Sequence, residues 1–373
     1  MGGVDERRPT VGPVTQDAPT ANRRDPVLMT SRNLQIRLES RPVGEPTPDN
    51  FRIVKSDMPA VSQGQMLLRA VYLSLDPYMR GRMDAGKSYV APVELGDVME
   101  GRTVAVVVDS QLEGYQPGEV VFNPGHGWQE YAVSDGSGVR KIDPSAGPLS
   151  YALGVLGMPG LTAYTGLKNI GQPKEGETLV VAAASGAVGS VVGQIGRIWG
   201  CRVVGIAGGP AKCKYVRDEL AFDECLDHRE PNLGDRLRAA CPEGIDIYFE
   251  NVGGQVFDAV LPLLNDFARI PVCGLIAHYN ATELPDGPDR VPKLLRNILI
   301  KRLTFRGFIV WDFASQLREF LSEMTEWLRT GQVKYKEDIT DGLENAPREL
   351  IGLLRGENFG KKVIRVSTDP TNG

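Results

Sequence analysis

The hydrophobic and polar positions follow two different rhythms along the chain. From Leu34 to about Asp143, short β-type runs are separated by Gly and Pro, which predicts a compact β-rich domain. The clearest of these runs are 65–75, 102–110 and 118–122. After Pro159 the pattern predicts strands that alternate with helices, which is typical of a parallel sheet with helical crossovers. We therefore place a domain boundary near residue 150 and expect an α/β fold whose second domain is of Rossmann type.

Apolar runs place the individual elements of the second region. Buried, β-branched runs predict strands at 178–183, 202–207, 244–251, 268–274 and 303–310. Helices are expected at 187–199 and 211–220. A further amphipathic helix, ending before Gly331, should carry Phe313, Leu317, Phe320, Leu321, Met324 and Leu328 on one face. The last apolar run, 361–366, is expected to return to the first domain.

A glycine-rich turn joins the first strand of this region to its first helix. In AAASGAVGS (182–190), Ala184, Gly186 and Gly189 stand at the three positions of G-x-G-x-x-G, with only the first glycine replaced. Gly186 lets the backbone approach a pyrophosphate, Gly189 lets helix and strand pack closely, and the helix N-terminus supplies N–H groups. Such a run can also be a simple flexible turn, but the strand, loop and helix around it favour a dinucleotide site.

The end of the second strand distinguishes NADP from NAD. An NAD site places an Asp or Glu there against the ribose hydroxyls, whereas this strand ends in Ala207, Gly208 and Gly209. Lys212, at the start of the next helix, can pair with a 2′-phosphate that an acid would repel. Lys212 alone is interpreted more simply as a solvated helix residue, but together with the missing acid it favours NADPH as the cofactor.

Composition and charge exclude several classes of protein. The 373 residues, 42% of them hydrophobic, are enough for two or three domains. The net charge of −5 with scattered Lys and Arg gives no basic face for nucleic acid, and no window approaches the length of a membrane span. Five widely spaced cysteines form no C-x-x-C pair, which argues against a disulfide framework and for a reducing, cytoplasmic compartment.

Residues 1–28 differ from the rest of the chain. They hold four Arg and four Pro but no apolar stretch of the signal-peptide type, and periodic sequence starts only near Met29. We expect a disordered tail whose removal leaves folding and turnover nearly unchanged.

The residue patterns of several other chemistries are missing. Only His126, His228 and His278 are present, none with a neighbouring His or Cys at metal-ligand spacing, so zinc is not expected and activity should survive chelation. The sequence also lacks G-x-S-x-G and the G-K-[ST] ending of a P-loop, which weakens hydrolase and kinase interpretations.

Several long segments carry a family likeness. They are YLSLDPYMRGRM (72–83), GVLGMPGLTAYTGL (154–167), the 182–190 loop, GIDIYFENVGG (244–254) and DGLENAP (341–347). Through them the chain, from about Leu34 to Val366, resembles the zinc-independent medium-chain dehydrogenase/reductases, specifically the NADPH-dependent double-bond reductases. Among these it is most similar to the bacterial curcumin/dihydrocurcumin reductases, through segments such as YNATELPDGPDR (279–290) and NFGKKVIRV (358–366).

The resemblance implies a split catalytic domain of GroES-like fold, formed by 29–150 and 333–367, around an inserted Rossmann domain at 151–332. The active site is then expected in the cleft between them. The cofactor residues that it implies are Gly186, Ala187, Val188, Gly189, Lys212, His228, Asn251, Cys273, Gly274, Tyr279, Phe308, Ile309, Val310 and Asn358. Tyr89 and Tyr279 match tyrosines that face the substrate, with core packing as the alternative for each. Homodimers are usual in the family.

The chain also departs from its family. His228 stands where many relatives carry a tyrosine near the adenosine phosphate, and His278 stands where a small polar residue is common. The loop 123–131 matches relatives only around Trp128 and Gln129. These departures leave both histidine contacts open, and they mean that the family likeness does not define the substrate.

The predicted reaction is hydride transfer from NADPH to the β-carbon of an enone or enal, with the carbonyl left unreduced. Neither a metal nor a Ser/Tyr/Lys proton relay is evident to activate a carbonyl, whereas an enone needs only a hydrogen-bond donor to its developing enolate oxygen. Tyr279 is the predicted donor. Two alternatives stay open: a zinc-free quinone oxidoreductase, and a catalytically idle NADPH-binding protein.

Overall fold

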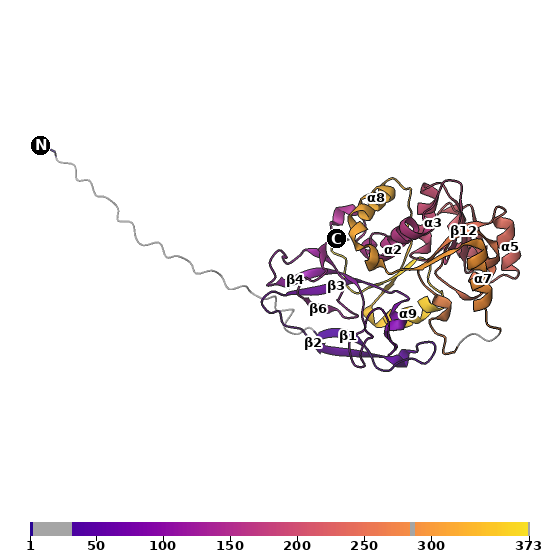
Figure 1. Ribbon diagram of the computed structural model, residues 1–373. Helices are drawn as coiled ribbons and strands as arrows, with labels where there is room; N and C mark the ends of the chain where they lie inside the picture. The colour runs from indigo at the N-terminus through magenta and orange to yellow at the C-terminus, as the bar shows by residue number, and fades with distance from the viewer. Residues whose placement is uncertain (3–31, 284–287, 372–373) are drawn as a thin grey trace.

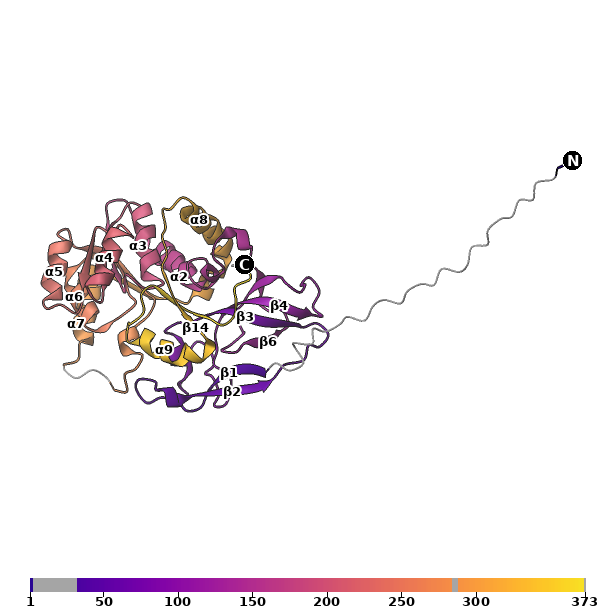
Figure 2. The ribbon, with the colours of Figure 1, turned by 180° about the vertical axis from the view of Figure 1, so that it is seen from behind.

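The computed structural model describes residues 1–2, 32–283 and 288–371, so nearly all of the tail expected at 1–28 lies outside the described residues. The described chain forms two lobes, one rich in β-strands and one with a central sheet between helices (Figure 1). Seen from behind, β14 (Glu337–Asp341) and α9 (Ala346–Leu354) lie where the lobes meet (Figure 2). None of the described helices has both the length and the apolar character needed to cross a membrane.

The β-rich lobe is built on a seven-stranded sheet. Its order is β14-β15-β3-β4-β5-β7, with β6 also paired to β3. The remaining strands of this sheet are β3 (Met66–Ser74), β4 (Thr103–Ser110), β5 (Val120–Asn123), β6 (Tyr131–Ser134), β7 (Arg140–Lys141) and β15 (Lys361–Arg365). A separate antiparallel pair consists of β1 (Arg32–Leu38) and β2 (Phe51–Asp57), and the short helix α1 (Met79–Arg82) follows β3. β3 pairs with three other strands, and its side chains pack into three apolar clusters, so this run is buried along almost its whole length.

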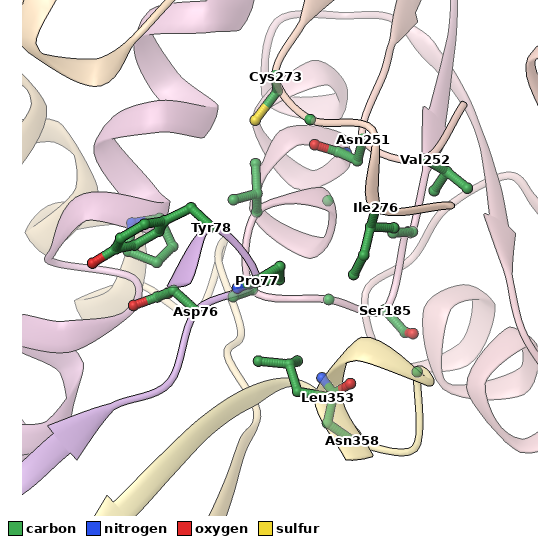
Figure 3. A pocket seen from close by; sticks show the side chains of 18 of the residues that line it. Asp76, Pro77, Tyr78, Ser185, Asn251, Val252, Cys273, Ile276, Leu353 and Asn358 are labelled. Atoms are coloured by element: carbon green, nitrogen blue, oxygen red, sulfur yellow. The ribbon is translucent and has the colours of Figure 1, made fainter. Parts of the chain in front are cut away.

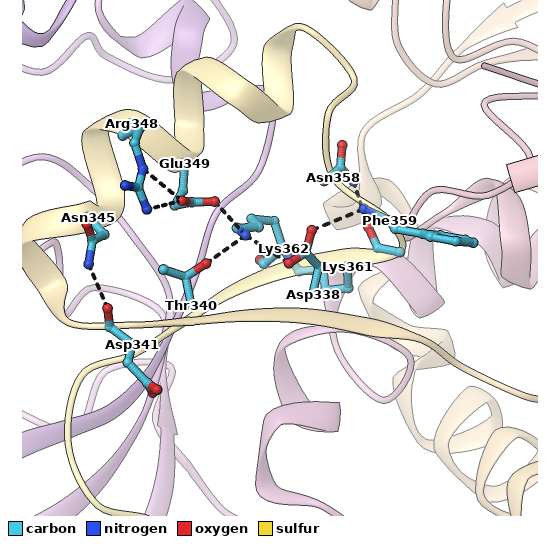
Figure 4. A network of polar contacts seen from close by, with 11 residues as sticks. Asp338, Thr340, Asp341, Asn345, Arg348, Glu349, Asn358, Phe359, Lys361 and Lys362 are labelled. Atoms are coloured by element: carbon cyan, nitrogen blue, oxygen red, sulfur yellow. Dashed lines mark hydrogen bonds and ion pairs between the residues drawn. The ribbon is translucent and has the colours of Figure 1, made fainter. Parts of the chain in front are cut away.

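The C-terminal segment returns to this lobe, as predicted from its apolar run. β15 pairs antiparallel with β3, with Ile364 opposite Leu73. The side chain of Lys362 joins α9 to the sheet, because its ammonium lies 2.9 Å from the Asp338 carboxylate and 2.5 Å from that of Glu349 (Figure 4). This network holds the segment between α9 and β15, which contributes to the cavity described below.

The second lobe contains six parallel strands in the order β10-β9-β8-β11-β12-β13, which is the strand order of a Rossmann domain. The strands are β8 (Thr178–Ala182), β9 (Arg202–Ala207), β10 (Glu224–Asp227), β11 (Ile245–Phe249), β12 (Leu264–Val272) and β13 (Thr304–Gly307). The helices are α2 (Met158–Gly166), α3 (Gly189–Ile198), α4 (Pro210–Asp218), α5 (Leu233–Ala240), α6 (Gly254–Val260), α7 (Val291–Lys301) and α8 (Leu317–Arg329). The predicted fold class is therefore confirmed.

The side chains of alternate residues in the central strands are buried on opposite faces of this sheet. Leu179 and Val181 of β8 belong to the apolar cluster that includes residues of α2, α3 and α8. Val180 and Ala182 of the same strand belong to the cluster on the other face, which includes residues of α5, α6 and α7. Both faces are covered, which is why these strands are continuous apolar runs in the sequence.

The structure differs from the sequence prediction after β13. The strand ends at Gly307, and the predicted amphipathic helix begins only at Leu317. Phe313 has non-helical backbone angles, φ −123° and ψ 23°. Asp312 accepts a hydrogen bond from the Ile309 amide at 3.0 Å, so the residues before α8 form a separate 3₁₀ segment.

Candidate active site

A cavity of about 550 Å³ opens between the two lobes. It is bounded by the segments that follow β8 and β11, where the strand order reverses and where Rossmann proteins bind their ligands. Every residue predicted to contact cofactor or substrate lines it, namely Tyr89, Gly186, Ala187, Val188, Gly189, Lys212, His228, Asn251, Cys273, Gly274, Tyr279, Phe308, Ile309, Val310 and Asn358. The cavity thus brings together residues that the sequence separates by up to 269 positions, from Tyr89 to Asn358.

The glycine-rich turn is shaped by one close backbone contact. A Cβ on Gly189, at the start of α3, would lie 2.4 Å from the Ala183 carbonyl oxygen, so no other residue fits there without a shift. Ala183 itself has a φ of +53°. Gly186 forms a parallel bridge with Gly360 of the C-terminal segment. The geometry agrees with the packing role predicted for Gly189, and it also ties the turn to the other lobe.

The far end of the cavity surrounds Gly208, directly after β9. Lys212 of α4 and His228, directly after β10, both line it. The Lys212 ammonium donates a 2.6 Å hydrogen bond to the Gly356 carbonyl. Burial, followed by the charge of Arg229, lowers the pKa values of both Lys212 and His228. Arg229, which the sequence analysis did not select, lines the same end.

Asn251 is presented by a turn after β11. Its side-chain amide donates to the Ala182 carbonyl at 2.8 Å, at the end of β8. The neighbouring Glu250 is buried, and one of its carboxylate oxygens accepts hydrogen bonds from the amides of Val252 at 2.7 Å and Gly253 at 2.9 Å. Burial raises the pKa of Glu250, although these hydrogen bonds oppose the shift. Glu250 therefore fixes the turn that carries Asn251, a role that the sequence analysis missed.

Cys273 and Tyr279 belong to one segment of the cavity wall, and Figure 3 shows Cys273 close to Asn251. The Tyr279 hydroxyl lies 3.4 Å from the Leu275 amide, which donates to it. Burial raises the pKa of Tyr279, and burial followed by the charge of Glu250 raises the pKa of Cys273 to about 12. Both groups are therefore neutral at pH 7. The Tyr279 hydroxyl can donate a hydrogen bond, whereas the Cys273 thiol is not activated as a nucleophile.

Tyr89 lies at the surface side of the cavity rather than in a core. It is 57% exposed, and its ring centre is 4.6 Å from the Arg82 guanidinium carbon. The structure thus decides against core packing for Tyr89. Tyr279 is half-buried in the cavity wall.

The sequence analysis also missed the loop Leu75–Tyr78, which supplies a further part of the wall from the β-rich lobe (Figure 3). Asp76 is buried beside Lys361, with 3.1 Å between carboxylate and ammonium, and Lys361 also donates to the Leu75 carbonyl at 2.6 Å. The Tyr78 hydroxyl accepts a 2.8 Å hydrogen bond from Arg102. The signal was available in LSLDPYMR, which served only as a mark of family likeness.

The remaining histidines do not line the cavity. His278 packs near Gly253, where an added Cβ would lie 3.0 Å from the imidazole, and His126 is fully buried in the β-rich lobe. Within 32–283 and 288–371, no three His, Cys, Asp or Glu residues gather closely enough to hold a metal ion.

The cavity residues fit a nicotinamide dinucleotide with a 2′-phosphate. The turn at Gly186 leaves room for a pyrophosphate, since an added Cβ there would have only the Ala183 carbonyl oxygen within 4 Å, at 3.2 Å. The N-terminus of α3 adds amide donors beside it. At the other end Lys212 and Arg229 supply positive charge where β9 ends without an acid.

Comparison with known proteins agrees with this fit. Residues 34–142 match a family model described as the N-terminal domain of oxidoreductase, and residues 187–326 match one described as zinc-binding dehydrogenase. The chain is 57% identical to the NADPH-dependent curcumin reductase of Escherichia coli over 91% of this chain and 98% of that protein. It is 39% identical to the NADP-dependent 2-alkenal reductase of Nicotiana tabacum, over 90% of this chain and 98% of that protein.

Solved structures extend the comparison to the fold. The CurA protein of Vibrio vulnificus in complex with NADPH superposes with a TM-score of 0.87 and 56% identity, covering 90% of this chain and all of that one. The quinone oxidoreductase of Escherichia coli, at 16% identity and a TM-score of 0.69, shares the fold alone, over 88% of this chain and 99% of that one. The chain belongs to the medium-chain dehydrogenase/reductases, and within them to the zinc-independent, NADPH-dependent double-bond reductases.

Proposed function

We propose that this protein reduces the carbon–carbon double bond of α,β-unsaturated ketones and aldehydes, including curcumin-like enones, with NADPH as its cofactor. The observation that carries the proposal is a single cavity lined both by a dinucleotide-binding turn and by Tyr279, whose hydroxyl is neutral. Relatives named as curcumin reductase, prostaglandin reductase and 2-alkenal reductase support the substrate class.

The chain's residues have separable roles in this reaction. Bound NADPH supplies a hydride to the β-carbon, and the resulting enolate takes a proton at its α-carbon from water. Tyr279 donates a hydrogen bond to the oxygen on which negative charge develops. Tyr89, at the exposed side of the cavity, contacts the substrate. Gly186–Gly189, Lys212, His228, Asn251, Cys273, Gly274, Phe308–Val310 and Asn358 hold the cofactor.

Product analysis tests the reaction. The protein, NADPH and an aliphatic enone are incubated together, the loss of NADPH absorbance is followed, and the products are separated. We expect the saturated ketone, with an allylic alcohol absent. Recovery of the allylic alcohol would overturn the proposed reaction. A larger kcat/KM for a quinone than for an enone would favour the quinone reductase alternative, and no turnover with either would favour an idle NADPH-binding protein.

We infer that the two lobes are the two domains drawn from the sequence, 29–150 with 333–367 and 151–332. Sheet membership supports this division, because β14 and β15 join the sheet of the β-rich lobe while β8–β13 form a sheet of their own. The compartment proposed is the cytoplasm, since all five cysteines are free and four of them are buried. Fractionation of cells that produce the full chain, followed by immunodetection, tests the compartment.

We further infer a homodimer formed through α7 and β13. Val291, Leu295 and Leu299 recur at four-residue spacing on α7 and are each more than half exposed. β13 ends the sheet order and, among the described strands, pairs only with β12. An apolar helix face beside an open sheet edge suits a second copy of the same chain.

Light scattering coupled to gel filtration tests the dimer. Leu295→Glu combined with Leu299→Glu should give a monomer at micromolar concentration, whereas Val43→Glu, at an exposed apolar residue of the other lobe, should not. A monomeric unaltered protein would refute the proposal.

A further inference from the structure

Three nitrogen-bearing side chains converge at the Gly208 end of the cavity. A Cβ added to Gly208 would lie 2.9 Å from Nε2 of His228 and 3.2 Å from Nε of Arg229. Lys212 lines the same end from α4. The imidazole and the guanidinium therefore rest directly against the backbone that follows β9, in the space that a side chain at this position would fill.

Asp227 forms no ion pair with the Arg229 guanidinium, although the charge of Arg229 helps to lower the pKa of Asp227. Asp227 uses Oδ1 to accept hydrogen bonds from the backbone amides of Gly209 and Arg229, both at 2.9 Å. In the described part of the chain, no ion pair or hydrogen bond engages the Arg229 guanidinium, whereas Arg236 on the neighbouring α5 is paired with Glu230 at 2.9 Å. Arg229 is thus a cation at a cavity wall whose five N–H donors are available for a ligand.

Lys212, the cation that the sequence singled out, uses one of its three N–H donors within the protein. Its ammonium donates to the Gly356 carbonyl at 2.6 Å, which links α4 to the segment between α9 and β15. That segment also carries Asn358 and Gly360, the partner of Gly186 in the turn. Lys212 therefore already serves to hold the C-terminal segment against the nucleotide-binding lobe.

We propose that Arg229 is the residue that distinguishes NADPH from NADH, by binding the 2′-phosphate through its guanidinium. Lys212, held in place by its hydrogen bond to the Gly356 carbonyl, adds a second positive charge at the same end of the cavity. The planar guanidinium matches two phosphate oxygens at once, which a lysine cannot do. Gly208 leaves Arg229 and His228 in this position, because a side chain there would require both of them to shift. This assignment rests on NADPH as the cofactor and adds a specificity-determining residue to the site.

Calorimetric binding of two nucleotide fragments tests the assignment without turnover. 2′,5′-ADP carries the 2′-phosphate and 5′-AMP lacks it, so the ratio of their Kd values reports that phosphate alone. Arg229→Gln should weaken 2′,5′-ADP roughly tenfold to hundredfold, the usual worth of a charge-assisted hydrogen bond, and change 5′-AMP less than about twofold. Arg238→Gln, at an exposed arginine of α5, is the matched control and should change neither. Melting temperatures of the variants check their folding.

Other outcomes of this experiment are equally decisive. If Arg229→Gln binds 2′,5′-ADP as tightly as the unaltered protein while Lys212→Gln loses it, Lys212 alone reads the phosphate and the assignment fails. If Arg229→Gln weakens both fragments equally, Arg229 shapes the adenosine site and the assignment also fails. If Arg229→Lys recovers only part of the 2′,5′-ADP affinity, the paired donors of the planar guanidinium contribute to binding in addition to its charge. If the unaltered protein does not prefer 2′,5′-ADP, the cofactor itself is wrong, which separates that failure from a failure of Arg229.

Discussion

The two lobes are stabilised by different physical means. In the described part of the Rossmann lobe, two large apolar clusters cover the sheet and only two charged residues, Asp227 and Glu250, are buried. The described part of the β-rich lobe buries Asp76, Arg80, Arg82, His126, Lys361, Lys362 and Asp369. The Rossmann lobe therefore depends almost entirely on non-directional burial. The β-rich lobe adds buried charges to apolar clusters of its own, and one of its ion pairs, Lys361 with Asp76, joins residues far apart in the chain.

The ion pair between Lys361 and Asp76 offers the most severe test of this contrast. Lys361→Met keeps a similar volume but leaves the Asp76 carboxylate buried without its cation. We expect the free energy of unfolding to fall by about 3–5 kcal/mol, the cost of breaking a buried pair from one side. Urea denaturation followed by tryptophan fluorescence measures it.

Two further variants sharpen that measurement. The double variant Asp76→Asn with Lys361→Met should recover part of the loss, because the unpaired charge is gone. Lys141→Met removes an exposed cation from Glu119 in the same lobe and should lower the free energy of unfolding far less than Lys361→Met. Equal costs for Lys361→Met and Lys141→Met would show that the buried pair does not stabilise the β-rich lobe in the way proposed.

Tyr279 lies in the cavity between the two lobes, and its role is tested by catalysis rather than by stability. Tyr279→Phe keeps the ring and removes the hydroxyl donor. The kcat for an enone should fall by roughly tenfold to a thousandfold, as it does when an oxyanion donor is removed, with a residual rate from binding alone. Steady-state kinetics measures the change.

Tyr89→Phe is the matched control for that variant. The Tyr89 ring lies over Arg82 at the exposed side of the cavity, so its loss of a hydroxyl should change KM more than kcat. An unchanged kcat in Tyr279→Phe, or an equal fall in both variants, would remove Tyr279 from its proposed role.

The same contrast explains what the sequence could predict. In the Rossmann lobe, strands such as 178–182 are uninterrupted apolar runs, and the glycine turn adjoins the strand and helix that define it. Local pattern therefore sufficed for the fold and for Gly186, Gly189 and Lys212. The pairing of Asp76 with Lys361 joins positions 285 residues apart, and no local period encodes it.

Arg229 was missed for a related reason. In the sequence it is one of several charged residues in DHRE, and only the folded chain places it against Gly208. Glu250 was missed because an acid at the end of a strand gives no sign that backbone amides will surround it. The family likeness supplied Tyr89, Asn251 and Asn358, which neither periodicity nor motif spacing would have selected.

His126 makes the stability of the β-rich lobe depend on pH. It is fully buried, and burial lowers its pKa from 6.5 to about 4. Because the folded-state pKa lies below the unfolded value, the unfolded chain binds the proton first as pH falls. The stability contributed by neutral His126 is thus present above pH 6.5 and is lost between pH 6.5 and 4, by about 2 kcal/mol from pH 7 to pH 5.

Urea denaturation at a series of pH values measures this loss. His126→Gln should flatten the profile by that amount relative to the unaltered protein. Parallel profiles for the unaltered protein and His126→Gln would contradict the prediction.

Gly189 and Gly234, both in the Rossmann lobe, provide the test with the smallest expected effect. Both lie in helices, and alanine in a helix is normally favoured over glycine by about 0.5–1 kcal/mol. A Cβ on Gly234 meets nothing within 4 Å, so Gly234→Ala should stabilise by about that amount. A Cβ on Gly189 would lie 2.4 Å from the Ala183 carbonyl oxygen, and overpacking of this kind costs about 1–3 kcal/mol. Gly189→Ala should therefore destabilise by about 1 kcal/mol net and weaken NADPH binding, because the turn must shift.

Thermal denaturation with and without NADPH separates the two effects. A Gly189→Ala protein as stable as Gly234→Ala would mean that the turn tolerates a side chain, and the close backbone contact would then not define the dinucleotide site.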